Sequence, residues 1–165
     1  MERMLLVVLI LALVSVGTVF ADGFTKATFG LGFGQVKWSV PGASGSEGTT
    51  SISTDVDFVN KFGFTIGLSG LLFKLDISGY NVQPADSMIL VGAGYTYVQD
   101  KWCAGGKIVA TAWLSDGFIF GIEGGGTFWF LDDLGVGGSV LILHPSGDTI
   151  VNSIWLLRVG ISIRF

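Results

Sequence analysis

The sequence predicts an all-β protein, an eight-stranded antiparallel up-and-down transmembrane β-barrel. Half of the 165 residues are hydrophobic and only 13% are charged, whereas soluble domains carry about 25% charged residues. Apolar residues alternate with polar or small residues along most of the chain, which is the period of a β-strand. Charged residues and many of the 26 glycines fall on the less apolar of the two alternating faces. A membrane barrel has this pattern, because its outer wall faces lipid and its lumen does not.

The N-terminus carries the one long apolar run. Arg3 precedes the hydrophobic segment 4–14, and Val19-Phe20-Ala21 then offers small or slim residues at the positions that signal peptidase reads. We therefore expect residues 1–21 to be a signal peptide and residues 22–165 to be the exported barrel. A permanent N-terminal anchor is the alternative.

Turn residues divide the remaining chain into eight expected strands. The connections are loops at 41–50, 81–86 and 144–150 and short turns at 69–70, 99–101, 115–117 and 131–133. Most strands reach the ~9–11 residues that cross a bilayer, and short links between neighbours predict an antiparallel meander. The expected strands are 25–40, 51–68, 71–80, 87–98, 102–114, 118–130, 134–143 and 151–165.

The two faces of these strands are assigned from charge. All charges within the strands fall on one face if the first strand has a bulge near Gly34-Gln35 that turns Val36 and Trp38 outward. A charge facing lipid at midplane costs about 2–4 kcal/mol, so the charged face is expected to line the lumen, together with Cys103. A secreted lipocalin-like barrel is the alternative, but a face that points to water has no need of so many glycines. Eight aromatic residues are expected outside, near strand ends: Trp38, Tyr95, Tyr97, Trp102, Phe128, Phe130, Trp155 and Phe165.

Opposite charges in a narrow lumen are expected to pair, because an unpaired buried charge is costly. Antiparallel pairing places Lys107 opposite or diagonal to Glu123, and the expected first loop places Lys37 opposite Asp55 and Gln35 opposite Asp57. The sequence thus predicts a charge network that plugs the barrel, with charges that merely solvate a wet lumen as the alternative. The candidate network comprises Lys37, Asp55, Asp57, Lys74, Asp76, Lys107, Glu123 and Arg158.

The last eight residues, Arg158-Val159-Gly160-Ile161-Ser162-Ile163-Arg164-Phe165, resemble the assembly signal of bacterial outer-membrane barrels. Polar Arg158, Gly160, Ile163 and the terminal Phe165 fit that signal, although Ile163 stands where an aromatic residue is common. With the signal peptide and eight strands, the chain is similar to the small OmpX-, OmpA- and OmpW-type barrels. The resemblance implies a location in the outer membrane of a diderm bacterium, contact with outer-membrane lipid, and recognition of the last strand by the barrel-assembly machinery.

Catalytic signals are weak. His144-Pro145-Ser146 matches the His-x-Ser spacing of lipid A deacylase barrels, but Gly147 replaces the following Asn of that motif, and Asp148 lies too close in a turn to complete a triad. One Cys and one His exclude a disulfide framework and a His/Cys zinc cage. The net charge of −4 gives no basic surface for nucleic acid. We expect no enzyme activity and no catalytic, cofactor-binding or metal-binding residue.

Three functions remain open at this stage. The first is a structural or surface-interaction role with a largely plugged lumen. The second is a narrow channel for small or hydrophobic molecules, and the third is a lipid A-modifying enzyme. The sequence names no extracellular ligand.

Overall fold

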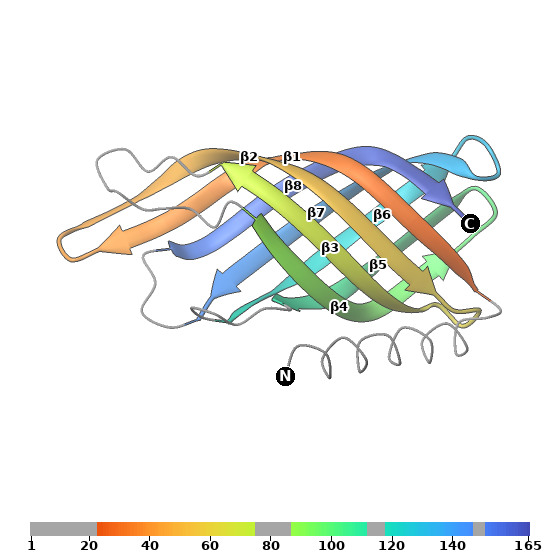
Figure 1. The fold of residues 1–165 in the computed structure, drawn as a ribbon, viewed down its shortest axis with the longest axis horizontal. Helices are drawn as coiled ribbons and strands as arrows, with labels where there is room; N and C mark the ends of the chain where they lie inside the picture. Colours follow the sequence, from red (N-terminus) through yellow and green to blue (C-terminus); the bar gives the residue numbers. More distant parts are fainter. Residues whose placement is uncertain (1–22, 75–86, 112–117, 147–150) are drawn as a thin grey trace, which may run out of the picture.

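The computed structural model describes residues 23–74, 87–111, 118–146 and 151–165. Within these ranges eight strands form a closed antiparallel barrel in which each strand pairs with its sequence neighbours and the last pairs with the first (Figure 1). The predicted fold class is confirmed. The strands are β1 (Phe24–Val40), β2 (Ala43–Val59), β3 (Phe64–Lys74), β4 (Ser87–Val98), β5 (Trp102–Thr111), β6 (Ile119–Trp129), β7 (Leu134–Pro145) and β8 (Val151–Arg164).

Side chains alternate between the lumen and the exterior along every strand, because successive residues of a β-strand point to opposite faces. On β8, Leu156 and Arg158 are buried, whereas Leu157 and Val159 between and beside them are about half exposed. The exterior is apolar: Ile108, for example, is 71% exposed. In the part of the chain that the structure describes, no helix is long and apolar enough to cross a membrane.

β1 and β8 close the barrel. Thr25 and Phe165 exchange two backbone hydrogen bonds, at 3.2 and 2.9 Å, which continue the seam between β1 and β8. The β1–β2 hairpin projects beyond the other strands at the opposite end of the barrel (Figure 1). The two ends of the barrel therefore differ, with the Thr25–Phe165 contact and short turns at one and the long hairpin at the other.

The predicted turn at Ser69-Gly70 is wrong, since both residues lie inside β3. The chain reverses at residues 60–63, where the side-chain amide oxygen of Asn60 accepts hydrogen bonds from the backbone N–H groups of Phe62 and Phe64. Gly63 has a φ of +89°, a conformation that suits glycine. Asn60 and Gly63 therefore stabilise this turn.

The predicted loop at 41–50 is also wrong. Only Pro41 and Gly42 form the turn, with Gly42 at a φ of +85°, and residues 43–50 belong to β2. The strands pair in a register that sets Lys37 opposite Ser46 and Gln35 opposite Gly48, not opposite Asp55 and Asp57.

The expected bulge near Gly34-Gln35 is absent. β1 alternates regularly there, so Val36 is completely buried in the lumen and Lys37 is exposed on the exterior. The register shift against β8 lies between Lys37 and Trp38 instead, and Trp38 packs against the lumen core rather than facing outward.

An apolar layer fills the half of the lumen nearer the β1–β2 hairpin. Its residues come from six of the eight strands and are at most 6% exposed. Alternation did not predict this layer, because most of its residues lie in short runs that are apolar on both faces of a strand. The layer consists of Val36, Leu71, Met88, Leu90, Val109, Leu141, Leu143, Ile154 and Leu156.

Candidate functional site

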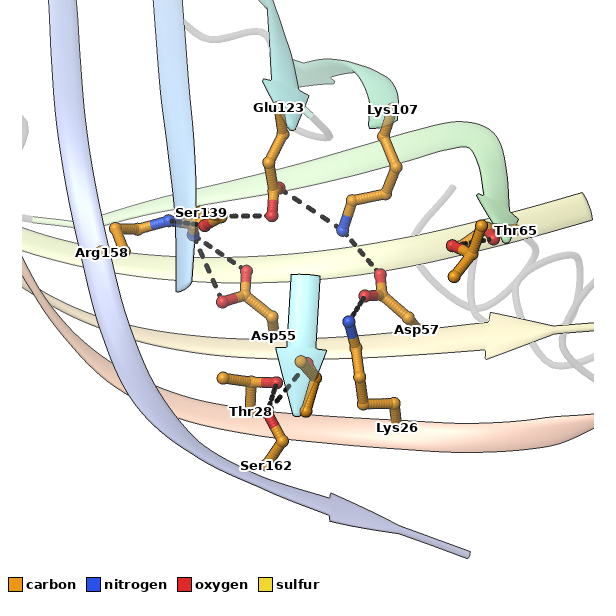
Figure 2. Close-up of polar contacts among 12 residues, drawn as sticks. Lys26, Thr28, Asp55, Asp57, Thr65, Lys107, Glu123, Ser139, Arg158 and Ser162 are labelled. Atoms are coloured by element: carbon orange, nitrogen blue, oxygen red, sulfur yellow. Dashed lines mark hydrogen bonds and ion pairs between the residues drawn. The ribbon is translucent and has the colours of Figure 1, made fainter. Parts of the chain in front are cut away.

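Six charged side chains contact one another across the lumen (Figure 2). We call them the charged layer. On β8, Arg158 of this group lies between Leu156 of the apolar layer and the last residue, Phe165. The six side chains are 3% to 15% exposed; four of the residues are buried, and Lys26 and Glu123 are half-buried. The charged layer consists of Lys26, Asp55, Asp57, Lys107, Glu123 and Arg158.

The first half of the charged layer centres on Lys107 of β5. Its Nζ lies 2.6 Å from Asp57 Oδ1, to which it donates a hydrogen bond, and 3.4 Å from Glu123 Oε2. Asp57 uses its other oxygen, Oδ2, to contact Lys26 Nζ at 3.2 Å. Lys107 and Glu123 face each other on adjacent strands, as their predicted pairing requires.

Arg158 of β8 makes the second half. Its Nη2 lies 2.6 Å from Glu123 Oε1, and its Nη1 donates to Asp55 Oδ1 at 3.0 Å. Its Nε donates to the hydroxyl of Ser139 at 3.1 Å. The ion pairs therefore run without a break from Lys26 through Asp57, Lys107, Glu123 and Arg158 to Asp55 (Figure 2).

The charged layer is electrically balanced, with three cations and three carboxylates that alternate along the chain of contacts. Taking ions out of water costs several kcal/mol each, so a lumen tolerates them only when each one is paired. Every carboxylate of the layer contacts at least one cation, and Lys107, Arg158, Asp57 and Glu123 each contact two partners. The arrangement satisfies that condition.

Glycines on neighbouring strands make room for these long side chains. A Cβ at Gly67 would lie against Asp57 Oδ1 and 2.9 Å from Lys107 Nζ. A Cβ at Gly32 would lie against the Ser51 hydroxyl and 3.1 Å from Arg158 Cγ. The glycine-rich inner face is therefore a packing requirement of the charged layer at these two positions.

Beside the charged layer lies a small cavity of about 50 Å³, which is room for a few water molecules. Hydroxyls from several strands line it, and two pairs tie strands together: Thr65 with Thr96 at 2.7 Å and Thr28 with Ser162 at 2.8 Å. Cys103 also lines the cavity and is buried, as the sequence indicated for a small lumen-facing residue.

Five of the eight predicted network residues come together in the charged layer: Asp55, Asp57, Lys107, Glu123 and Arg158. Lys37 does not join them, because it points to the exterior. The side chain of Lys74 and the whole of Asp76 lie outside the part that the structure describes. Lys26 was missed as a partner, although its position on the polar face of the first strand was a usable signal.

The candidate assembly-signal residues divide between the two faces of β8. Arg158 and Gly160 face the lumen, whereas the Phe165 ring is 74% exposed on the exterior, and Ile163 is half-buried. The other aromatic residues expected outside, apart from Trp38, are between 39% and 56% exposed. Arg164 stacks its guanidinium over Trp129, 5.0 Å from the ring centroid.

The residues that suggested an enzyme lie near the end of β7. The His144 ring packs against Phe120 with a centroid separation of 6.0 Å, and the Ser146 hydroxyl donates to the Phe118 carbonyl at 2.6 Å. Asp148 lies outside the described residues. Among those residues, no group of three or more His, Cys, Asp or Glu side chains is placed to hold a metal ion.

Solved structures of small outer-membrane barrels share this fold. Neisserial surface protein A matches with a TM-score of 0.54 at 11% identity, covering 86% of this chain and 97% of that one. Ail, the attachment invasion locus protein of Yersinia pestis, matches with a TM-score of 0.52 at 12% identity, covering 85% and 98%. The N-terminal barrel domain of Pseudomonas aeruginosa OprF matches with a TM-score of 0.51 at 10% identity, covering 86% and 97%.

The chain has the fold of the small eight-stranded outer-membrane β-barrels. A de novo designed transmembrane β-barrel matches equally well, with a TM-score of 0.52 at 9% identity. No family model and no curated protein matches the sequence. The likeness therefore resides in the architecture, and the role of this small outer-membrane-type barrel has to be argued from its own residues.

Proposed function

We propose that this chain is an integral outer-membrane protein with a closed lumen and a structural or surface-interaction role, and that it is not an enzyme. The apolar exterior supports membrane insertion, because residues such as Ile66, Val91, Ile108 and Ile161 are 37–71% exposed, as lipid-facing residues are. The fold, which it shares with barrels of bacterial outer membranes, supports the same location.

The proposal of a closed lumen rests on the side chains that fill it. The apolar layer holds residues such as Leu90 and Leu141 at 0% exposure, and the paired charged layer lies directly next to it. Water and ions have to displace both layers to pass. Eight strands enclose a lumen just wide enough for side chains to fill, which is the physical reason why both layers close it.

The signal peptide expected at residues 1–21 supports an orientation. An N-terminus delivered by a signal peptide starts in the periplasm, so the end with Thr25 and Phe165 faces inward and the β1–β2 hairpin faces the outside of the cell. The last strand then presents Phe165 to the barrel-assembly machinery, its expected partner.

Single-channel recording in planar bilayers tests the closed lumen. We expect purified wild-type protein to show no steady conductance. A triple variant, Leu90→Ala, Leu141→Ala and Leu156→Ala, removes three side chains of the apolar layer and is expected to conduct or flicker. A steady conductance from the wild-type protein contradicts the proposal and favours a narrow channel.

The narrow channel is the second candidate function, and the cavity beside the charged layer is the observation that favours it. Liposome swelling with small solutes of graded size is its direct measurement. The lipid A-modifying alternative is tested separately, by the mass of lipid A incubated with the protein in detergent micelles. A mass change that depends on His144 contradicts the non-enzymatic role.

A further inference from the structure

The cavity beside the charged layer has a one-sided position in the lumen. All six residues of the charged layer line it, whereas none of the nine residues of the apolar layer does. On β5, Lys107 lies between Cys103, which lines the cavity, and Val109 of the apolar layer. The charged residue of β8 likewise lies between Gly160 and Leu156. On these two strands the charged layer therefore separates the cavity from the apolar layer.

Two polar groups in the cavity wall indicate a hydrogen-bonding ligand. Ser53 of β2 is 2% exposed, and its hydroxyl has no hydrogen-bond partner among the described residues, which is costly for a buried group. Its partner on β1 is Gly30, where a Cβ would lie 3.1 Å from this hydroxyl, so no side chain of that residue covers it. Lys26 contacts only Asp57 within the charged layer, whereas an ammonium can donate three hydrogen bonds.

Size and charge identify the ligand as water. The cavity of about 50 Å³ has room for a few water molecules and is too small for an organic solute. The charged layer is already neutral, with three cations and three carboxylates, so an added ion would be an unpaired buried charge. Buried water typically makes about three hydrogen bonds to polar groups of the kind that Ser53 and Lys26 present.

We propose that the cavity is a binding site for a cluster of water molecules, anchored by Ser53 and Lys26, that hydrates the charged layer from one side. The apolar layer is then the barrier to water, and the charged layer ties the strands together around a wet cavity. This assignment goes beyond a closed lumen, because it states which layer closes it. It depends on the packing of the lumen and not on the membrane location or the orientation proposed above.

Transfer of magnetisation from water to side chains, measured by solid-state NMR on the barrel in lipid bilayers, tests the site. Ser53 and Lys26 are expected to receive the magnetisation rapidly, whereas Leu90 and Leu141 of the apolar layer receive it slowly. Slow transfer to all four overturns the water site and leaves the closed lumen intact. Rapid transfer to all four shows water in the apolar layer, which overturns the assigned barrier and the closed lumen together.

A matched pair of serines on β2 tests the anchor. Ser51 is 4% exposed, and its hydroxyl also lacks a hydrogen-bond partner among the described residues, but it does not line the cavity. Ser53→Ala removes a hydrogen bond to water, so we expect slower water transfer to Lys26 and a roughly five-fold larger unfolding equilibrium constant in urea titrations. Ser51→Ala removes a hydroxyl that has no partner and is expected to leave that constant unchanged or to lower it. Equal unfolding constants for the two variants overturn the role of Ser53 as an anchor.

Discussion

Lys107 Nζ lies 2.6 Å from Asp57 Oδ1, although their strands β5 and β2 are not neighbours in the barrel. β3 and β4 separate them along the wall, so the ion pair crosses the lumen. Arg158 of β8 makes a comparable link to Glu123 of β6, past β7. These contacts connect parts of the wall that are not neighbours, in addition to the backbone hydrogen bonds and side-chain pairs, such as Thr28 with Ser162, that join adjacent strands.

Removing Glu123 is expected to destabilise the barrel. Glu123→Ala leaves three cations with two carboxylates in the lumen, and breaking a buried pair in this way costs about 3–5 kcal/mol. The double variant Glu123→Ala, Lys107→Ala restores the charge balance, so its cost is expected to be smaller than the sum of the two single costs. Urea unfolding in lipid vesicles measures all three free energies, with the exposed Asp100→Ala as a control close to wild type. Additive costs would contradict the coupling.

The packing of the charged layer is tested at Gly67 of β3. Gly67→Ala places a methyl group against the Asp57–Lys107 contact, and overpacking of this kind costs about 1–3 kcal/mol. Gly124→Ala is the matched control, because a Cβ there meets nothing closer than 3.9 Å. Thermal unfolding of both variants in the same detergent is the comparison. A Gly124 variant as unstable as the Gly67 variant would refute the assigned role of Gly67.

The alternation of the sequence predicted the faces of the strands better than their ends. The apolar parity runs unbroken from Ile52 to Leu68, which hides the turn at residues 60–63. This turn keeps odd-numbered residues in the lumen on both sides, so Asp57 and Thr65 were placed inside correctly even though the strand boundary was wrong. Asn60 and Gly63 carried the signal for the turn.

Lys37 and the apolar layer show where reasoning from charge fails. A charge is excluded from the exterior only within the hydrocarbon region, and β1 has 17 residues, more than the ~9–11 that a span requires. Lys37 therefore sits outside that region and needed no bulge to bring it inward. The apolar layer was hidden because Leu141–Leu143 and Ile154–Leu157 are apolar on both faces, and a pattern without contrast cannot separate lumen from lipid.

The apolar layer is expected to behave as a protein core. Leu141 is completely buried, and Leu141→Ala is expected to lower the free energy of unfolding by about 2–5 kcal/mol through lost contacts and a residual cavity. Val140→Ala, on the exterior of the same strand, creates no internal cavity and is expected to cost much less. Denaturant titration of the vesicle-inserted variants checks the difference, and equal costs would contradict a packed lumen.

The outer wall is tested by placing a charge on it. Ile108→Lys is expected to cost about 2–4 kcal/mol if its position lies near the bilayer midplane, since the side chain is 71% exposed and would face acyl chains. Gln99→Lys adds the same charge in the exposed turn between β4 and β5 and is expected to cost little. Both are measured as free energies of folding into vesicles. Equal tolerance at the two positions would show that Ile108 faces water.

Phe165 is expected to act in assembly rather than in stability. Its backbone N–H and carbonyl close the seam with Thr25, whereas its ring is 74% exposed and has little contact to lose. Phe165→Ala keeps the backbone seam and removes only the ring that the assembly machinery is expected to recognise. We therefore expect the variant to be exported normally, to accumulate unfolded in the periplasm, and yet to refold in vesicles with near wild-type stability.

The measurement for Phe165→Ala is the fraction of protein in the outer membrane that migrates as folded in unheated gel samples. The control is Phe62→Ala, which removes an exposed ring from the turn between β2 and β3. Wild-type levels of folded Phe165→Ala in the membrane would refute the signal, and a matching loss of stability in vesicles would show that the ring acts in the fold itself.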